Sequence, residues 1–204
     1  MITINIDLGS AREVKALVLY DHNLTSAATI TLIGVDPTIL NESVTWAADK
    51  ILHYLAAATT KRYWQIQITD DTNPDGYIRI GELFMGSYME LSKHYTEGYS
   101  KGFSLLYDEN KTPYGVSKKR FYNKQRNFQY DYNYLLSADI VLLEALLDAI
   151  TDRDTGEFNP FYFNEDSAVP ANNWLVDIDE LPEDHQERSY YKSSLQFVEV
   201  MRSV

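Results

Sequence analysis

A stretch in the first half of the chain matches the spacing of a calcium-binding loop, D-x-[DN]-x-[DN]-G-x5-E. The matching residues are Asp71, Asn73, Asp75, Gly76 and Glu82. Carboxylate and amide oxygens at these positions are the ligands that calcium requires. An EF-hand also needs a helix on both sides of the loop, whereas residues 64–69 alternate like a strand, and Pro74 stiffens the loop itself. We therefore interpret the segment as a turn and predict that it holds no metal.

The histidines show no spacing that favours a zinc or catalytic site. They are His22, His53, His94 and His185, and none has a histidine or cysteine partner at i+2, i+3 or i+4. His22 follows a strand-like run. It either contacts a sugar hydroxyl or, as we expect, forms a hydrogen bond within its own loop.

Motifs of covalent or phosphoryl-transfer catalysis are absent from the sequence. It contains no G-x-S-x-G elbow, no P-loop and no cysteine. Acidic residues are numerous, but no spacing among them selects a carboxylate pair for glycoside hydrolysis. We predict that the chain is not an enzyme and needs no cofactor.

The net charge of −12 argues against a nucleic-acid partner, because neutralising phosphates requires a basic face. No apolar run approaches the ~20 residues that span a bilayer, so we do not expect membrane insertion.

Two runs of like charge lie in the second half of the chain. The basic run consists of Lys118, Lys119, Arg120, Lys124 and Arg126; the acidic run consists of Asp177, Asp179, Glu180, Glu183, Asp184 and Glu187. Either both runs are solvated loops, or they face each other across a subunit boundary and set the register of a ring.

Composition divides the chain near Ser87. Residues 1–88 carry 10 acidic and 6 basic residues, residues 89–204 carry 20 and 12, and 11 of the 16 tyrosines lie in the second part. The first part contains short β-rich runs at 3–8, 14–20, 28–33, 62–69, 77–80 and 82–85, each followed by turn residues. Runs of this length and spacing are typical of an antiparallel β-sandwich.

The second part predicts an α+β domain with one main helix. Residues 127–134 alternate as a strand does, and a helix over 138–150 follows, with Ser137 as its N-cap. We expect the Ile140, Leu143 and Leu147 side of this helix to pack on the aromatic face of the strand. That face consists of Phe128, Tyr130, Tyr132 and Tyr134. Aromatic faces also bind sugars, but core or interface packing is the interpretation we favour. Further strands are predicted at 160–163, 174–178 and 190–201, while residues 87–115 show no clear period.

Two blocks of the first part resemble the discoidin-like, galactose-binding-type β-sandwich of phage tail proteins. One is Ile6-Asp7-Leu8-Gly9-Ser10, followed by residues 14–20 and His22-Asn23-Leu24. The other is Asn73-Pro74-Asp75-Gly76-Tyr77-Ile78, followed by residues 80–86. Such sandwiches have several tens of residues before the Asp-Leu-Gly strand. The resemblance therefore implies either that residues are missing before this strand or that a neighbour completes the sandwich.

The second part resembles the ring-forming domain of distal tail or baseplate proteins in the order of its elements. The matching elements are the aromatic strand, the helix, Pro160-Phe161-Tyr162-Phe163 and the final Phe197-Val198-Glu199-Val200 strand. Together the resemblances imply a mostly β chain: a discoidin-like jelly-roll sandwich at 1–88 and an α+β tail-assembly domain at 89–204.

The implied function is structural. The resemblance implies a component of the phage tail, assembled in the host cytoplasm, that forms a homo-oligomeric ring and binds other tail proteins without a cofactor. The alternative is a carbohydrate-binding module in which the first domain recognises a host-surface glycan. Fold alone does not separate the two, because the same sandwich serves both roles.

Overall fold

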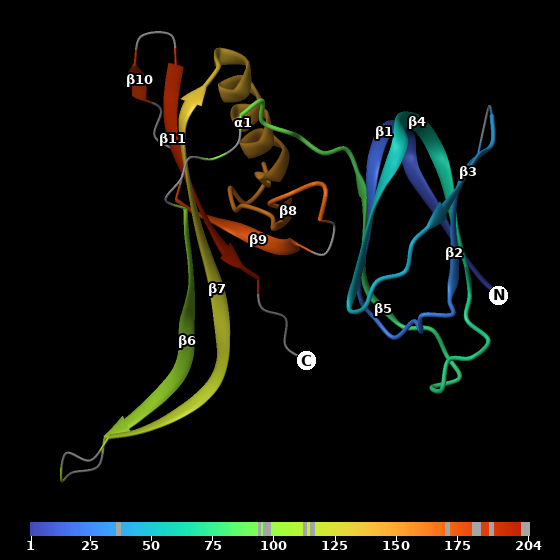
Figure 1. The fold of residues 1–204 in the computed structure, drawn as a ribbon, viewed down its shortest axis with the longest axis horizontal. Coiled ribbons are helices and arrows are strands. Elements are labelled where there is room, and N and C mark those ends of the chain that lie inside the picture. The colour runs from blue at the N-terminus through green and yellow to red at the C-terminus, as the bar shows by residue number, and fades with distance from the viewer. Residues whose placement is uncertain are drawn as a thin grey trace. The chain divides into compact units, whose positions relative to one another are not determined.

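A computed structural model describes residues 1–35, 38–93, 95, 99–111, 114, 117–169, 172–180, 185–187 and 190–200. The described residues form two antiparallel sheets and one helix, which confirms a mostly β fold with one main helix (Figure 1). The chain divides into two compact units: Met1–Tyr88 with Asn164–Asn173, and Met89–Phe163 with Trp174–Val204.

The first unit is a sheet of five strands that folds back on itself. The strands are β1 (Ile2–His22), β2 (Thr29–Val35), β3 (Leu40–Val44), β4 (Lys50–Thr69) and β5 (Ile80–Gly86), in the order β3-β2-β4-β1-β5. The two long strands, β1 and β4, pair along most of their length. The end of β4 lies between β2 and the beginning of β1, whereas the end of β1 lies between β5 and the first half of β4. Bending of the two long strands therefore produces a sandwich-like arrangement.

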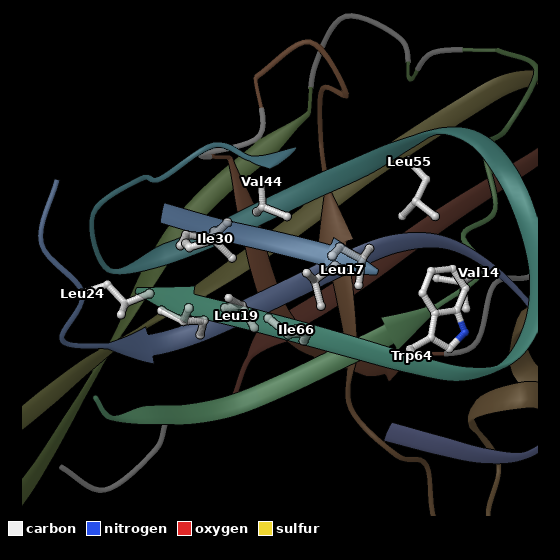
Figure 2. Close-up of a cluster of buried hydrophobic side chains, with 12 residues drawn as sticks. Val14, Leu17, Leu19, Leu24, Ile30, Val44, Leu55, Trp64 and Ile66 are labelled. Atoms are coloured by element: carbon white, nitrogen blue, oxygen red, sulfur yellow. The ribbon is translucent and has the colours of Figure 1, made fainter. Parts of the chain in front are cut away.

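Apolar side chains from all parts of this sheet meet in one core. Figure 2 shows Leu17 and Leu19 of β1 beside Ile30 of β2 and Ile66 of β4, and all four are fully buried or nearly so. Trp64 fills the end of the core near Val14. Alternation of apolar and polar residues along each strand directs the apolar set inward.

The Asp-Leu-Gly element lies where β1 changes register against β4. Asp7 accepts hydrogen bonds from Arg62 Nε at 2.7 Å and Nη2 at 2.8 Å, and its Oδ1 also accepts the Gly9 N–H at 2.8 Å. Gly9 has a φ of 74°, a conformation that favours glycine. The element is therefore a bulge that is held across the two strands by a bidentate ion pair.

The prediction of a strand at 77–80 was wrong, since β5 begins only at Ile80. The backbone here forms hydrogen bonds with the Asn23 side chain instead. The Tyr77 carbonyl accepts from Asn23 Nδ2 at 3.0 Å, and the Arg79 N–H donates to Asn23 Oδ1 at 2.7 Å. Gly81 does not end a strand either. It lies inside β5, where an added Cβ would come within 2.8 Å of the Asp21 carboxylate.

The second unit contains a sheet of six strands and the helix. Its strands are β6 (Ser100–Lys111), β7 (Ser117–Leu135), β8 (Phe161–Asn164), β9 (Asn173–Glu180), β10 (His185–Glu187) and β11 (Tyr190–Glu199). The order is β6-β7-β11-β9-β8, with β10 paired to β11. The helix α1 (Ser137–Ile150) follows β7 directly and buries Ile140 and Leu143 against Phe128, Tyr130 and Tyr132, as the sequence predicts. Leu147, predicted on the same side, is only half-buried and lies outside this cluster.

Tyr134 and Ser137 differ from their predicted positions. Tyr134 is 61% exposed and lies edge-on to Tyr190, because β7 gains a residue against β11 between Tyr132 and Leu135. Leu135 takes the buried position instead. Ser137 is the first residue of α1 rather than its N-cap, and the cap position is Leu136.

Asp139, in the first turn of α1, accepts hydrogen bonds from backbone N–H groups near the start of the helix. Its carboxylate accepts the Leu136 N–H at 2.8 Å and both the N–H and the hydroxyl of Ser92, at 2.8 and 2.6 Å. Burial acts to raise the pKa of Asp139, but these hydrogen bonds outweigh it and hold the pKa below its usual value. The chain before β6 is thereby tied to the helix.

Residues 164–173 pack with the first unit although they fall within the part of the sequence assigned to the second domain. The Asn164 side chain donates to the Tyr54 hydroxyl at 2.8 Å, and Lys50 Nζ donates to the Asn173 carbonyl. Both contacts are on the first half of β4, whose outer edge has no strand neighbour among the described residues. Side chains from the first half of β4 therefore tie both ends of this segment to the first unit.

Candidate functional site: the hairpin of β6 and β7

The most unusual feature of the second unit is a long hairpin that no other described residue covers on either side. Its strands pair without interruption from Ser100 with Gln129 to Lys111 with Ser117, apart from one bulge. We call residues 100–111 and 117–126 the hairpin arm. Every described side chain of the arm from 100–110 and 117–124 is exposed, whereas Phe128 and Tyr130 farther along β7 are buried. The arm thus leaves the core and extends to a tip at the far end of the sheet from α1 (Figure 1).

Large apolar side chains are exposed along the arm. Phe103 is 56% exposed, Leu105 59%, Leu106 41%, Tyr107 43%, Phe121 58% and Tyr122 51%. Single exposed apolar residues are ordinary, but a concentration of this kind marks an interaction site.

Pairing across the two strands sorts these side chains onto two faces. Directly opposed residues share a face, and Phe103 opposes Arg126, Leu105 opposes Lys124, and Tyr107 opposes Phe121. We call this side the aromatic–basic face. It comprises Lys101, Phe103, Leu105, Tyr107, Glu109, Lys119, Phe121, Lys124 and Arg126, so four basic residues and one acidic residue lie on it. The opposite side is more polar near the body of the unit, where the Asn127 side chain donates to Ser104 Oγ at 2.7 Å.

Cations on the aromatic–basic face lie over its rings. Lys124 Nζ is 5.0 Å from the centre of the Phe103 ring, and Lys119 Nζ is 4.5 Å from that of Tyr107. These distances are within the range of cation–π attraction. The contacts hold the charged ends against the sheet, so the face presents apolar and positively charged groups together.

The aromatic–basic face continues directly from the buried aromatic core. Phe128 follows Arg126 on the same side of β7 and packs 5.0 Å from Trp174, ring centre to ring centre. Lys101 and Arg126 lie over the Trp174 ring at 5.8 and 5.7 Å, where the core ends. Arg126 Nε also lies 3.7 Å from a Glu199 carboxylate oxygen. Beyond this point the same face of the sheet is exposed.

All five residues of the basic run lie on β7 in the arm, so the run is part of a strand rather than a loop. Lys119, Lys124 and Arg126 belong to the aromatic–basic face, whereas Lys118 and Arg120 oppose Asn110 and Asp108 on the other side. The apolar residues of the arm were not predicted as site residues. They come together only through the pairing of β6 with β7, which the sequence did not indicate.

The acidic run lies largely outside the described part of the chain. Asp177 is a half-buried residue of β9, and burial raises its pKa. The side chains of Asp179, Glu180 and Glu187, and the whole of Glu183 and Asp184, fall outside the described residues. A meeting of the acidic run with the basic run therefore stays a prediction.

The residues of the calcium-loop match form a turn linked to Asn23. Asn73 Oδ1 accepts the Asp75 N–H at 3.0 Å, and Asp75 Oδ2 accepts from the Asn23 side chain at 2.8 Å. Gly76 has a φ of 70°, and Glu82 lies apart from the turn on β5, opposite Tyr20. In the part of the chain that the structure describes, no three His, Asp or Glu side chains are placed to hold a metal ion.

Two histidines are described, and both have internal partners. His22 is 8% exposed and its Nδ1 accepts the Leu24 N–H at 3.2 Å. Burial lowers the pKa of His22, despite a hydrogen bond to the Ala47 backbone and the nearby carboxylates of Asp49 and Asp21. His53 Nε2 lies 3.0 Å from Glu42 Oε2. His94 and the His185 side chain are outside the described residues.

No protein-family model matches the chain, and searches of curated proteins and of solved structures find no similar chain. Within the described ranges, no helix has the length and apolar character needed to cross a membrane.

Proposed function

We propose that the chain is a structural subunit of a phage tail, in the distal tail or baseplate region, and that the hairpin arm is its main protein-binding element. The phage assignment rests on the resemblance of the Asp-Leu-Gly and Asn-Pro-Asp-Gly blocks and of the element order in the second unit. The observation that carries the mode of action is the uncovered aromatic–basic face. A protein whose function is mechanical must present such a surface to its neighbours.

The exposed rings of the arm favour burial against another protein. Burying a fully exposed side chain the size of Phe or Leu contributes about 1.5–3 kcal/mol, so covering the exposed half of Phe103, Leu105 or Phe121 contributes roughly 1–2 kcal/mol each. Tyr, Phe and Arg are also the residue types enriched in the centres of protein interfaces. The arm would therefore have a lower free energy when bound to another protein than when exposed to solvent.

The charge of the arm indicates an acidic partner. Residues 100–111 and 117–126 contain seven Lys or Arg and two Asp or Glu, a net charge of +5. Because the whole chain carries −12, the remaining residues carry −17. Opposite charges on two surfaces accelerate encounter and set orientation. A second copy of the chain, or another acidic tail protein, meets this requirement.

Mass spectrometry of purified particles of the encoding phage, combined with immunogold labelling, tests the proposal. We expect the chain among the virion proteins at a fixed copy number, with label on the tail. Its absence from purified particles that are otherwise complete would refute the assignment. A control antibody against a capsid protein should label heads and not tails.

A further inference from the structure

The outer side of α1 is a second uncovered surface of the unit. Val141 is 61% exposed and Leu142 37%, and the small side chains of Ala138, Ala145 and Ala149 are exposed around them. Glu144 and Asp148 flank this apolar strip, and α1 contains no Lys or Arg. We call these seven residues the outer face of α1. The face is apolar and acidic, the opposite of the arm in charge and similar to it in hydrophobicity.

The arm cannot reach the helix of its own subunit. β7 runs from Ser117 near the tip to Leu135 beside the start of α1, a distance of roughly 50–60 Å at about 3.3 Å per residue. Figure 1 shows α1 and the far ends of β6 and β7 at opposite ends of the same sheet. Any contact between the arm and α1 therefore joins two copies of the chain.

We infer that the aromatic–basic face of the arm docks on the outer face of α1 of a second copy, an inference that rests on the proposed function. The two faces match in length: α1 has 14 residues and is about 21 Å long, and the strand from Phe103 to Glu109, which lies opposite Lys119, extends about 20 Å. Phe103, Leu105 and Phe121 cover the strip around Val141 and Leu142. Lys124 and Lys119 lie near Glu144 and Asp148.

Such a contact is heterologous, because the arm of one copy meets a different surface of the next. Each copy then binds one neighbour through its arm and another through its α1. Repetition of this contact gives a closed ring or an open filament. The charge pairs at the rim contribute little affinity individually but fix which end of the arm meets which end of the helix.

Cysteine cross-linking tests the contact, since the natural chain has no cysteine. Phe121→Cys and Val141→Cys are made separately in the full chain, mixed and oxidised. We expect a disulfide-linked dimer in the mixture and little in either variant alone, with a ladder of multimers from the double variant. Ser104→Cys, on the opposite face of the arm, is the matched control and should link to Val141→Cys at least tenfold less. Equal linking of the two arm positions, or no linking, would overturn the inference.

Exchange of the charges at Lys124 and Glu144 distinguishes failure of the helix contact from failure of the proposed function. Lys124→Glu and Glu144→Lys should each weaken self-association at low salt by about tenfold, and their combination should restore most of it. If Lys124→Glu weakens association while Glu144→Lys does not, the arm has another acceptor. The helix contact is then wrong while the arm keeps its role. If neither exchange matters, the helix contact is also wrong, and the particle measurement alone decides the proposed function.

Discussion

The guanidinium carbon of Arg126 lies 5.8 Å from the centre of the Phe103 ring, on the strand pair where the aromatic face of the sheet leaves the core. On one side of this pair the face is covered by Trp174 and Phe163, and on the other side it is exposed. The pair therefore marks the boundary between residues that stabilise the fold and residues available for binding.

Phe121→Ala and Phe128→Ala test this boundary on one strand. At a concentration where the chain is monomeric, we expect Phe121→Ala to change the free energy of unfolding by less than about 0.5 kcal/mol, because the ring is exposed. Phe128 is 3% exposed, so its loss leaves a cavity and should cost about 3–5 kcal/mol. Urea unfolding followed by tryptophan fluorescence measures both. Similar losses for the two variants would place the boundary elsewhere.

Leu143→Ala and Val141→Ala make the same comparison on α1. Leu143 is 4% exposed in the aromatic core, so its truncation should cost about 2–5 kcal/mol. Val141 is 61% exposed and its truncation should leave the stability of the monomer nearly unchanged. Circular dichroism during thermal unfolding, at a concentration where the chain is monomeric, distinguishes them. A loss below 0.5 kcal/mol for Leu143→Ala would contradict the packing of α1 on β7.

Asp139→Asn should destabilise the protein at neutral pH by about 1–3 kcal/mol. Asn keeps one acceptor oxygen but lacks the charge that Ser92 and Leu136 bind. Since the pKa of Asp139 is lower in the folded protein, the stabilisation by its carboxylate is complete above the unfolded pKa of about 3.9 and is lost as pH falls through the folded pKa.

Urea titrations at neutral pH and near pH 2 measure this effect. The difference in free energy of unfolding between the wild type and Asp139→Asn should be smaller in acid. At a concentration where the chain is monomeric, Asp148→Asn, on the exposed side of α1, is the control and should have little effect. A difference that persists in acid would mean that the charge is not what stabilises the helix start.

The Asp7 carboxyl should titrate unusually low. Hydrogen bonds from Arg62 and then from the Gly9 N–H lower the pKa of Asp7 to about 2. NMR titration of the side-chain carboxyl carbon should find this value, and Arg62→Gln should move it upward toward the ordinary range. The contribution of the ion pair to stability is present above the unfolded pKa and disappears as pH falls through about 2. An ordinary pKa in the wild type would contradict the bidentate pair that bridges β1 and β4.

Elements with one buried face could be predicted from the sequence. Alternation at 127–134 and helical spacing at 138–150 follow from burial on one side, and both elements are present. The class of fold was predictable for the same reason. The prediction put Tyr134 on the buried face of the strand. It is exposed because β7 has one extra residue against β11 at this point, and the alternation of residue types along the strand does not reveal such a bulge.

The hairpin arm could not be predicted in this way. Both of its faces are exposed, so no alternation distinguishes them, and residues 87–115 showed no period although β6 lies within them. The basic run was visible as a run of charge. Its aromatic partners on β6 were not, because the pairing of Phe103 with Arg126 is set by the register of two strands.

The molar mass in solution, measured by sedimentation equilibrium at low salt, tests the central claim most directly. We expect the wild-type chain to form oligomers whose mass is a multiple of 23.5 kDa, and a Phe103→Ser, Phe121→Ser double variant to remain folded and monomeric at the same concentration. Association of the wild type should weaken as salt rises, because the arm and its partner carry opposite charges. A double variant that assembles as the wild type does would contradict the role of the arm, as would a wild-type chain that stays at 23.5 kDa at the highest concentration reached.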